Sequence, residues 1–241
     1  MIFKDEYFNE KAVPPAGSEY VCWLDMMGTQ QKMIDSMPRA TIHIFKFHSI
    51  LAKAKSENVS IYPVMDGVYI SAKTFDDLTS YLISVFTALG GIIISTKKPE
   101  NRFLVRGGIA FGPLLHGHDV PEQASIALHE RQDIRNQILV GPSMSQAYQT
   151  ESQAPPFGIC LHDSVRLYAL RTKKPPRYFD KWWKWWSSCA TQDFSDGEFL
   201  QQLRTSINEY FDYACKHSYT LSYEKSSITK HKEQFAEYFL E

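Results

Sequence analysis

The sequence predicts an α+β fold in which two strand-helix units share one sheet, and three observations support this prediction. Short apolar runs alternate with longer amphipathic stretches along most of the chain. Two β-prone runs joined by an Asp-Gly pair indicate a hairpin in the middle of this series. The chain has 241 residues, of which 44% are hydrophobic, so it can bury a full-sized core. The order β-α-β-β-α-β is that of a ferredoxin-like sheet, and we expect its helices to cover one face.

The first strand and the first helical region are predicted from residues 20–55. Residues 20–24 form a short apolar run that ends at Asp25, which is the pattern of a buried central strand. After a glycine-containing turn, residues 33–55 carry apolar side chains at helical spacing, namely Ile42, Phe45, Ile50 and Leu51. We therefore expect a strand that leads directly into an amphipathic helix.

A β-hairpin and a second helix follow. Residues 59–72 contain two β-prone runs on either side of Asp66-Gly67, which is a strong hairpin signal. Residues 76–89 are amphipathic and predict a helix capped by Thr74 or Asp76. The later elements expected are a strand over residues 103–115, a helix over residues 143–152 and a strand over residues 158–161.

Changes in composition divide the chain into three parts. Residues 1–18 are polar, contain two adjacent prolines and are predicted to form an N-terminal arm. Residues 19–176 hold the predicted α+β domain. Residues 177–241 are rich in aromatic residues and predict a helical extension of two or three helices.

Three tryptophans stand near the start of this extension. Trp182, Trp185 and Trp186 fall at positions i, i+3 and i+4, so they are predicted to form one face of a helix. Their stretch is short, and we expect it to make a core or dimer contact and not to insert into a membrane.

Charge, cysteine content and hydropathy argue against several classes of protein. Lys and Arg number 26 against 27 for Asp and Glu, so no basic field is available to hold nucleic acid. The four cysteines are far apart and are expected to be reduced thiols. No apolar run follows the N-terminal charges, and the longest apolar stretch, residues 88–95, is shorter than the roughly 20 residues of a membrane helix. We expect a soluble, cytoplasmic protein without nucleic-acid or membrane partners.

Two acidic residues, Asp25 and Asp66, each follow an apolar strand run. In the predicted sheet, the end of the first strand and the turn of the hairpin lie side by side at the centre. Two carboxylates there repel each other unless a divalent cation lies between them, and Mg²⁺ is held by one or two carboxylates together with substrate phosphates. Alternatively, Asp25 caps a helix and Asp66 belongs to an ordinary turn. For the pair together we favour a metal site.

Two further segments fit an anionic substrate. Met27, Gly28 and Thr29 join the first strand to the following helix, where free backbone N–H groups suit a triphosphate and the glycine permits close approach. Arg106 opens a later strand and could reach a phosphate or the acid of a partner. The alternative is a purely structural arginine at a strand end.

Four sequence blocks, taken in order, resemble the class III nucleotidyl cyclase domain. They are Leu-Asp-Met-Met-Gly at residues 24–28, Met-Asp-Gly at 65–67, Arg-Gly-Gly-Ile-Ala-Phe-Gly at 106–112 and Gly-Pro-Ser-Met-Ser-Gln-Ala-Tyr at 141–148. The resemblance spans about residues 20–161. Within this superfamily the chain is most similar to the bacterial pyrimidine (uridylate or cytidylate) cyclases of the Pycsar antiphage system.

This resemblance implies a homodimer whose active sites form between the chains. Two divalent cations, Mg²⁺ or Mn²⁺, would be held by Asp25 and Asp66 with help from the Met26 carbonyl. The 3′-hydroxyl of a nucleoside triphosphate would attack its own α-phosphate, with the phosphates contacting residues 27–29. Asp25, Asp66 and Arg106 would then be the catalytic residues.

Departures from the family pattern bear on the substrate. Tyr62 stands where adenylate cyclases carry a lysine four residues before the second aspartate, and Ile138 occupies their other adenine-reading position. The pair typical of guanylate cyclases is absent too, so purines are disfavoured, and Tyr62 could contact a smaller pyrimidine. Ser145 and Gln149 replace the family's catalytic Asn and Arg. Transition-state charge would therefore be neutralised by Arg106 or by a lysine.

The sequence thus predicts a metal-dependent pyrimidine nucleotide cyclase. It would convert UTP or CTP into cUMP or cCMP, the 3′,5′-cyclic monophosphates, and pyrophosphate, and the product would be a second messenger in antiphage defence. One alternative is a catalytically inactive, cyclase-fold nucleotide sensor. The other is a palm-type synthase of cyclic oligonucleotides, because palm domains share this type of sheet and its paired acids.

Overall fold

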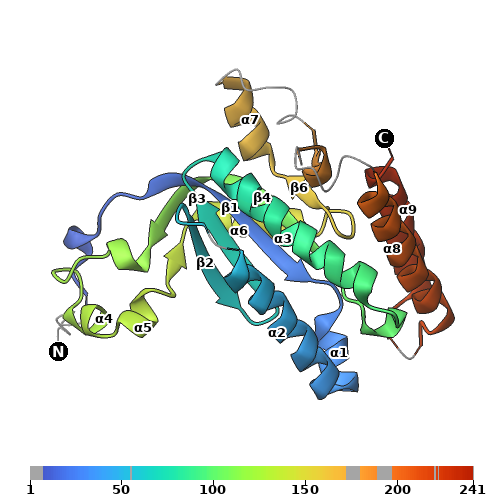
Figure 1. The fold of residues 1–241 in the computed structure, drawn as a ribbon. Helices are drawn as coiled ribbons and strands as arrows, with labels where there is room; N and C mark the ends of the chain where they lie inside the picture. The colour runs from blue at the N-terminus through green and yellow to red at the C-terminus, as the bar shows by residue number, and fades with distance from the viewer. Residues whose placement is uncertain are drawn as a thin grey trace.

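A computed structural model describes residues 8–54, 56–171, 180–188, 197–219, 221 and 223–240 (Figure 1). The strands are β1 (Gly17–Met26), β2 (Val59–Val64), β3 (Gly67–Ala72), β4 (Val105–His116), β5 (Leu139–Val140), β6 (Ile159–Leu161) and β7 (Trp182–Trp183). The α-helices are α1 (Thr29–Asp35), α2 (Met37–Lys53), α3 (Phe75–Ser95), α4 (Ile126–Glu130), α5 (Gln132–Arg135), α6 (Pro142–Glu151), α7 (Asp163–Arg171), α8 (Glu198–Lys216) and α9 (Lys225–Tyr238). Short 3₁₀ turns cover Glu10–Ala12, Pro99–Asn101, Gly117–Asp119 and Trp185–Ser188.

The strands form one sheet in the order β2-β3-β1-β4-β6-β7, and β5 pairs with the end of β4. β1 is antiparallel to both β3 and β4, and β2 is antiparallel to β3. This is the ferredoxin-like arrangement, so the predicted α+β class is confirmed. β6 adds in parallel to β4, and β7 pairs antiparallel with β6. The edges are therefore β2, which carries Pro63, and the two-residue strand β7.

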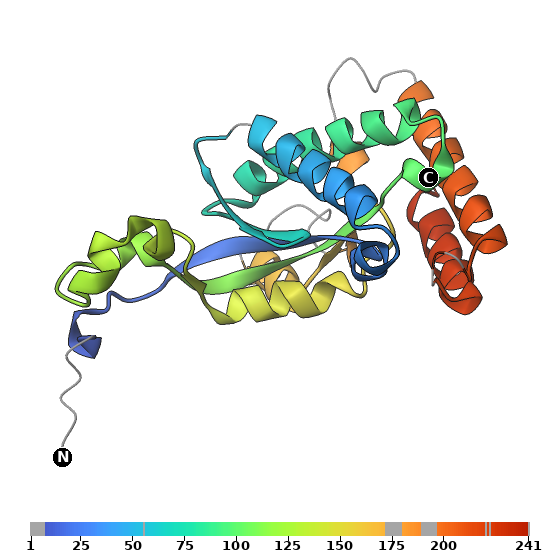
Figure 2. The same cartoon turned by 90° about the horizontal axis from the view of Figure 1, so that it is seen from below.

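Helices cover both faces of the sheet, which corrects the expectation of one covered face. Figure 2 shows α2 and α3 on one side of the strands and α6 on the other. α6 can lie directly on β4 because residue 108 is a glycine. A Cβ atom at Gly108 would lie 2.3 Å from the carbonyl oxygen of Ala147 and 2.6 Å from the backbone nitrogen of Glu151. The second glycine of this strand is thus a packing requirement of α6.

Helix α3 begins after Thr74, whose hydroxyl accepts a hydrogen bond from the backbone N–H of Asp77 at 3.1 Å. The predicted cap is therefore confirmed, but the helix continues to Ser95. By length and composition alone α3 could span a membrane, and half of its most apolar window is buried inside the protein. The uninterrupted apolar run at residues 88–95 is shorter than this helix of 21 residues, because polar residues such as Asp76 and Ser80 stand between the apolar ones earlier in the helix.

The apolar residues expected in this helix divide between the two faces of α2. Ile50 and Leu51 are buried, whereas Ile42 and Phe45 are 54% and 69% exposed. The buried face also contains His43, so hydropathy alone could not separate it from the exposed face. Ile34, Met37 and Met65 are exposed apolar side chains as well.

The C-terminal extension contains the predicted helices as α8 and α9, but the tryptophans do not form a helix face. Trp182 and Trp183 form β7, opposite Cys160 and Ile159 of β6, and Trp185 begins a 3₁₀ turn. Backbone pairing with the otherwise open edge of β6 explains this difference. The predicted boundary between residues 176 and 177 lies outside the described residues.

The cysteines whose structure is described carry free thiols. Cys22 and Cys160 are buried in β1 and β6, Cys215 is half-buried in α8, and Cys189 lies outside the described residues. Burial raises the pKa of Cys160 to about 11 and raises that of Cys22 further. These two thiols are protonated parts of the core, as the sequence predicted for reduced cysteines.

Candidate active site

Asp25 lies near the end of β1, between two antiparallel neighbours. Its Cα partners are Gly67 of β3 and Arg106 of β4. Asp66 immediately precedes Gly67 in the hairpin turn, so the structure brings the two predicted acids together. A Cβ atom at Gly67 would lie 2.3 Å from the ring of Trp23 and 2.9 Å from Oδ1 of Asp25. Only glycine leaves room for the aspartate at this point of the turn.

The electrostatic environment of Asp25 has a surplus of negative charge. Burial raises the pKa of Asp25 to about 7, and the charges of Asp66 and Glu151 act in the same direction. Arg106 and a backbone hydrogen bond at Met26 lower this pKa without restoring its usual value. A bound cation would offset the repulsion among these carboxylates.

The oxygen atoms of Asp25, Asp66 and the Met26 carbonyl suit a hard divalent cation. Asp25 and Asp66 offer carboxylates, and the Met26 carbonyl accepts one hydrogen bond, from the Thr29 hydroxyl at 3.2 Å. That carbonyl keeps a second lone pair. Within the described ranges, no group of three or more His, Cys, Asp and Glu residues is arranged to hold a metal ion. Two carboxylates with waters and substrate phosphates are the usual surroundings of Mg²⁺, so these residues fit such an ion.

Arg106 is paired with Glu151, at the last turn of α6. The Nε–H of Arg106 donates a hydrogen bond to the Glu151 carboxylate, and the two side chains are only 20% and 11% exposed. Burial raises the pKa of Glu151, and the neighbouring guanidinium opposes this rise. Arg106 is therefore a partly buried, oriented cation next to Asp25. Glu151 was not predicted as a site residue.

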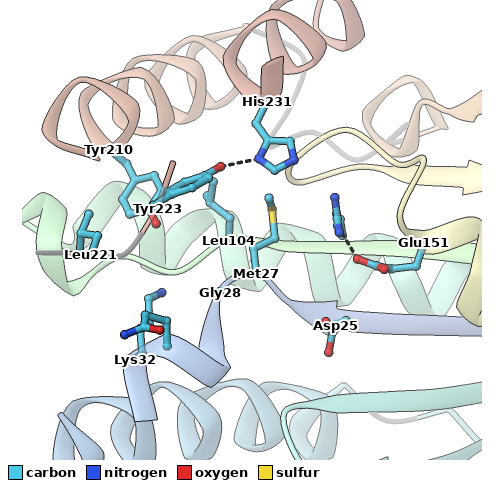
Figure 3. Close-up of a pocket in the computed structure, with 12 residues that line it drawn as sticks. Asp25, Met27, Gly28, Lys32, Leu104, Glu151, Tyr210, Leu221, Tyr223 and His231 are labelled. Carbon is cyan, nitrogen blue, oxygen red and sulfur yellow. Dashed lines mark hydrogen bonds and ion pairs between the residues drawn. The ribbon is translucent and has the colours of Figure 1, made fainter. Parts of the chain in front are cut away.

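A cavity of about 180 Å³ opens beside Asp25, between the sheet and the C-terminal helices (Figure 3). The core lines it with Asp25, Met27, Gly28, Gln31, Lys32, Leu104, Arg106 and Glu151. The C-terminal extension adds Tyr210, Leu221, Tyr223 and His231. The cavity therefore joins the end of β1 to the hairpin of α8 and α9.

Lys32 supplies a buried positive charge to this cavity. Its Nζ atom is shielded from solvent and has no hydrogen-bond partner within the described part of the chain. Burial lowers the pKa of Lys32 to about 8, and the charge of Arg39 adds to this effect. A buried ammonium group without a counter-ion is costly unless an anion binds it. The sequence analysis did not identify Lys32, because nothing local distinguishes it from a surface lysine of α1.

The residues predicted to bind substrate divide into two sets. Met27 and Gly28 line the cavity, and Thr29 is buried next to them. Tyr62 does not line it. The Tyr62 hydroxyl forms a hydrogen bond with Nδ1 of His116, toward the opposite end of β4. The structure therefore brings residues 27–29 to Asp25 but leaves Tyr62 outside this cavity.

The C-terminal wall was not predicted to belong to the site. The Tyr223 hydroxyl and Nδ1 of His231 form a hydrogen bond across the top of the cavity (Figure 3). Burial lowers the pKa of His231 to about 4, and the charges of Arg106 and Lys230 lower it further. His231 is therefore a neutral imidazole at neutral pH. No local sequence signal joins residues 223 and 231 to residue 25.

No family model matches the sequence, and no curated protein matches it. Among solved structures, the chain is similar to the guanylyl cyclase domain of the RhoGC fusion protein from the aquatic fungus Blastocladiella emersonii, with 15% identity and a TM-score of 0.42 over 66% of this chain and 88% of that one. It is also similar to an adenylate/guanylate cyclase/hydrolase from Silicibacter pomeroyi, with 16% identity and a TM-score of 0.45 over 67% and 82%. A bacterial light-regulated adenylyl cyclase matches with 12% identity and a TM-score of 0.47 over 66% and 47%. These likenesses concern the fold, and the similarity to pyrimidine cyclases stays a prediction.

Proposed function

We propose that the protein is a metal-dependent nucleotidyl cyclase that converts UTP or CTP into the 3′,5′-cyclic monophosphate and pyrophosphate. One juxtaposition carries this proposal. Asp25 and Asp66 form a site with surplus negative charge. Asp25, but not Asp66, lines the cavity in which the buried ammonium group of Lys32 has no hydrogen-bond partner among the described residues. The carboxylates would be stabilised by a metal ion, and the ammonium group of Lys32 would be stabilised by an anion. A metal–nucleoside triphosphate complex supplies both.

The reaction needs positioning and charge neutralisation more than a covalent intermediate. Mg²⁺ or Mn²⁺, held by Asp25, Asp66 and the Met26 carbonyl, would polarise the α-phosphate and favour ionisation of the 3′-hydroxyl. The 3′-oxygen bonds to the α-phosphorus, the bond to the β-phosphate oxygen breaks, and the hydroxyl proton passes to solvent. Lys32 and Arg106 would neutralise charge on the departing pyrophosphate.

Pyrimidine specificity and the biological role belong to the same proposal. Tyr62 and Ile138 replace the residues that read adenine in the cyclases this chain resembles, which supports a pyrimidine base. A homodimer in the cytoplasm, producing an antiphage second messenger, follows from that resemblance. Exposed apolar side chains at Phe45 and Met65, 69% and 75% exposed, support an association surface.

A catalytically inactive nucleotide sensor is the second candidate. Ser145 and Gln149, which replace the family's catalytic pair, are exposed on α6 and do not line the cavity. Arg106 is already paired with Glu151. Such a protein would bind nucleotide and metal without turnover.

Incubation of the full chain with each of the four nucleoside triphosphates and Mn²⁺ or Mg²⁺ tests the proposal, with products resolved by mass spectrometry. We expect cUMP or cCMP from the wild type and none from Asp66→Ala. The exposed Asp119→Ala serves as the matched control and is expected to retain activity. Nucleotide binding without any product would favour the sensor. Linked dinucleotides would move the assignment to a palm-type synthase.

A further inference from the structure

The hairpin of α8 and α9 is fixed to the domain that holds Asp25. Arg102, only 4% exposed, donates hydrogen bonds to the Ser206 carbonyl at 2.7 Å and to the Glu209 carboxylate at 2.8 Å. The fully buried rings of Phe211 and Phe235 lie 5.9 Å apart between the two helices and belong to the main core. The hairpin is therefore held against the domain by buried contacts and forms one wall of the cavity.

His231 occupies a position in α9 that would suit an apolar residue. Ile228, Phe235 and Tyr238 form the buried face of this helix, and residue 231 lies on the same face. His231 instead lines the cavity. This helix face therefore presents one imidazole to the cavity that Asp25 and Arg106 line.

Tyr223 determines which imidazole nitrogen faces the cavity. Its hydroxyl bonds to Nδ1 of His231, and burial raises the pKa of the phenol, so the phenol keeps its proton. We assign Tyr223 as the donor to Nδ1, because its hydroxyl forms no other hydrogen bond among the described residues, and the proton of the neutral imidazole then lies on Nε2. Nε2 makes no hydrogen bond to any residue that the structure describes. It is thus a free donor in the cavity that Arg106 and Lys32 also line, and the Arg106 charge acts directly on this imidazole.

We propose that the α8–α9 hairpin forms one wall of the substrate site, and that His231 donates a hydrogen bond from Nε2 to a phosphate oxygen of the bound nucleotide. Tyr223 is then a positioning residue that acts through His231. The inference rests on the proposed function for the identity of the anion, a polyphosphate chain. It adds a wall from the same chain to the arrangement that the family resemblance implies, in which a second chain contributes to the site.

Binding of inorganic pyrophosphate to the full chain, measured by calorimetry with Mg²⁺ present, tests this inference without requiring turnover. We expect His231→Ala to weaken binding about tenfold or more, because one hydrogen bond to a charged oxygen is lost. His231→Gln places an amide N–H near the position of Nε2 and is expected to stay within about threefold of wild type. Tyr223→Phe removes only the anchor of the imidazole and is expected to fall between these two variants.

The same hairpin offers a matched control pair. Tyr213 lies in α8 and His217 caps the C-terminal end of this helix. Their rings also stack, with centroids 4.1 Å apart, but neither residue lines the cavity. Tyr213→Phe and His217→Ala are expected to bind pyrophosphate like the wild type. A purely structural role for His231 would make His231→Gln as weak a binder as His231→Ala, and this result would overturn the inference.

Failure of this inference and failure of the cyclase proposal are distinguishable. Suppose that no nucleotide is turned over, yet pyrophosphate affinity falls in His231→Ala and is kept in His231→Gln. The role of His231 in polyphosphate binding is then supported, and the proposed cyclase activity is not. If His231→Ala forms cyclic product with an unchanged KM and binds pyrophosphate normally, the cyclase stands and the inference is wrong.

Discussion

Arg106 and Glu151 form an ion pair that joins β4 to the last turn of α6 immediately beside Asp25. The pair fixes the position of a cation that would otherwise be mobile. It also adds a carboxylate to the group that raises the pKa of Asp25. The packing of α6 and the charge at the candidate metal site therefore depend on the same contact.

We expect Glu151→Gln to lower the free energy of unfolding by about 2 to 3 kcal/mol, because Arg106 loses its counter-charge in a partly buried position. Urea denaturation measures this change. The exposed Arg131–Asp133 pair, with side chains 61% and 62% exposed, provides the control. Asp133→Asn is expected to leave the free energy of unfolding unchanged, because solvent screens an exposed ion pair. Equal effects of the two substitutions would contradict the structural role of Glu151.

Removal of metal is expected to destabilise the protein through Asp25 and Asp66. At a hundredfold excess over its Kd, Mn²⁺ should raise Tm by about 5 to 10 °C relative to EDTA. Asp25→Asn and Asp66→Asn should lose this increase, whereas Asp119→Asn should keep it. Differential scanning fluorimetry measures the shifts. An increase that persists in both site variants would place the ion elsewhere.

Lys32→Met is expected to change the stability of the fold and the affinity for nucleotide in opposite directions. Replacing an unpaired buried ammonium with an apolar side chain of similar length should raise the free energy of unfolding by about 1 to 2 kcal/mol. The same change should weaken nucleotide binding more than about tenfold. Lys53→Met, at an exposed position of α2, is the control for both measurements. A destabilised Lys32→Met protein that still binds nucleotide would show that Lys32 has another partner.

The buried His43 is expected to make the protein sensitive to acid. Burial lowers the pKa of His43 to about 4, with smaller contributions from Lys32 and Lys46. The unfolded chain binds this proton near pH 6.5, so the stabilisation is complete above that pH and is lost as the pH falls toward 4. Between pH 7 and pH 5 the loss should be on the order of 1 to 2 kcal/mol. His43→Gln should reduce this pH dependence, as followed by urea denaturation at each pH. An identical pH dependence in the variant would show that other groups are responsible.

Gly108→Ala is expected to disrupt the packing of α6 on β4. The new methyl group would overlap backbone atoms of α6, which cannot move independently, so we expect a loss of about 3 kcal/mol or more. Gly91→Ala is the matched control, because nothing lies within 4 Å of a Cβ atom there. Gly91 lies within α3, so alanine should stabilise the protein by about 0.5 to 1 kcal/mol. Similar effects of the two substitutions would refute this account of Gly108.

Features set by neighbours in sequence were predicted well. The Asp-Gly turn of the hairpin depends on local backbone preference, and Thr74 caps α3 through a contact three residues away. The proximity of Asp25 and Asp66 followed from the strand order alone. Local signals were therefore sufficient for the ferredoxin-like core and for the acidic half of the candidate site.

Features that depend on distant contacts could not be predicted. Lys32 differs from a surface lysine only because its ammonium group is buried in a cavity that the distant C-terminal extension helps to line. Glu151 is a site residue only because α6 ends over Arg106. His231 lies more than two hundred positions from Asp25 in the sequence. The hydrogen-bond partner of Tyr62, His116, is likewise distant in sequence, and Tyr62 does not line the cavity.

The two ends of the strand order restrict how this protein can aggregate or assemble. A foreign strand that approached β2 would meet Pro63, which has no N–H to offer a ladder. At the other end, β7 is only two residues long, and the Trp183 carbonyl already accepts a hydrogen bond from the Tyr238 hydroxyl at 2.6 Å. Sheet extension from molecule to molecule is disfavoured at both ends. We therefore expect a second copy to dock through side chains on a face of the described structure, where a single substitution should abolish association without unfolding either chain.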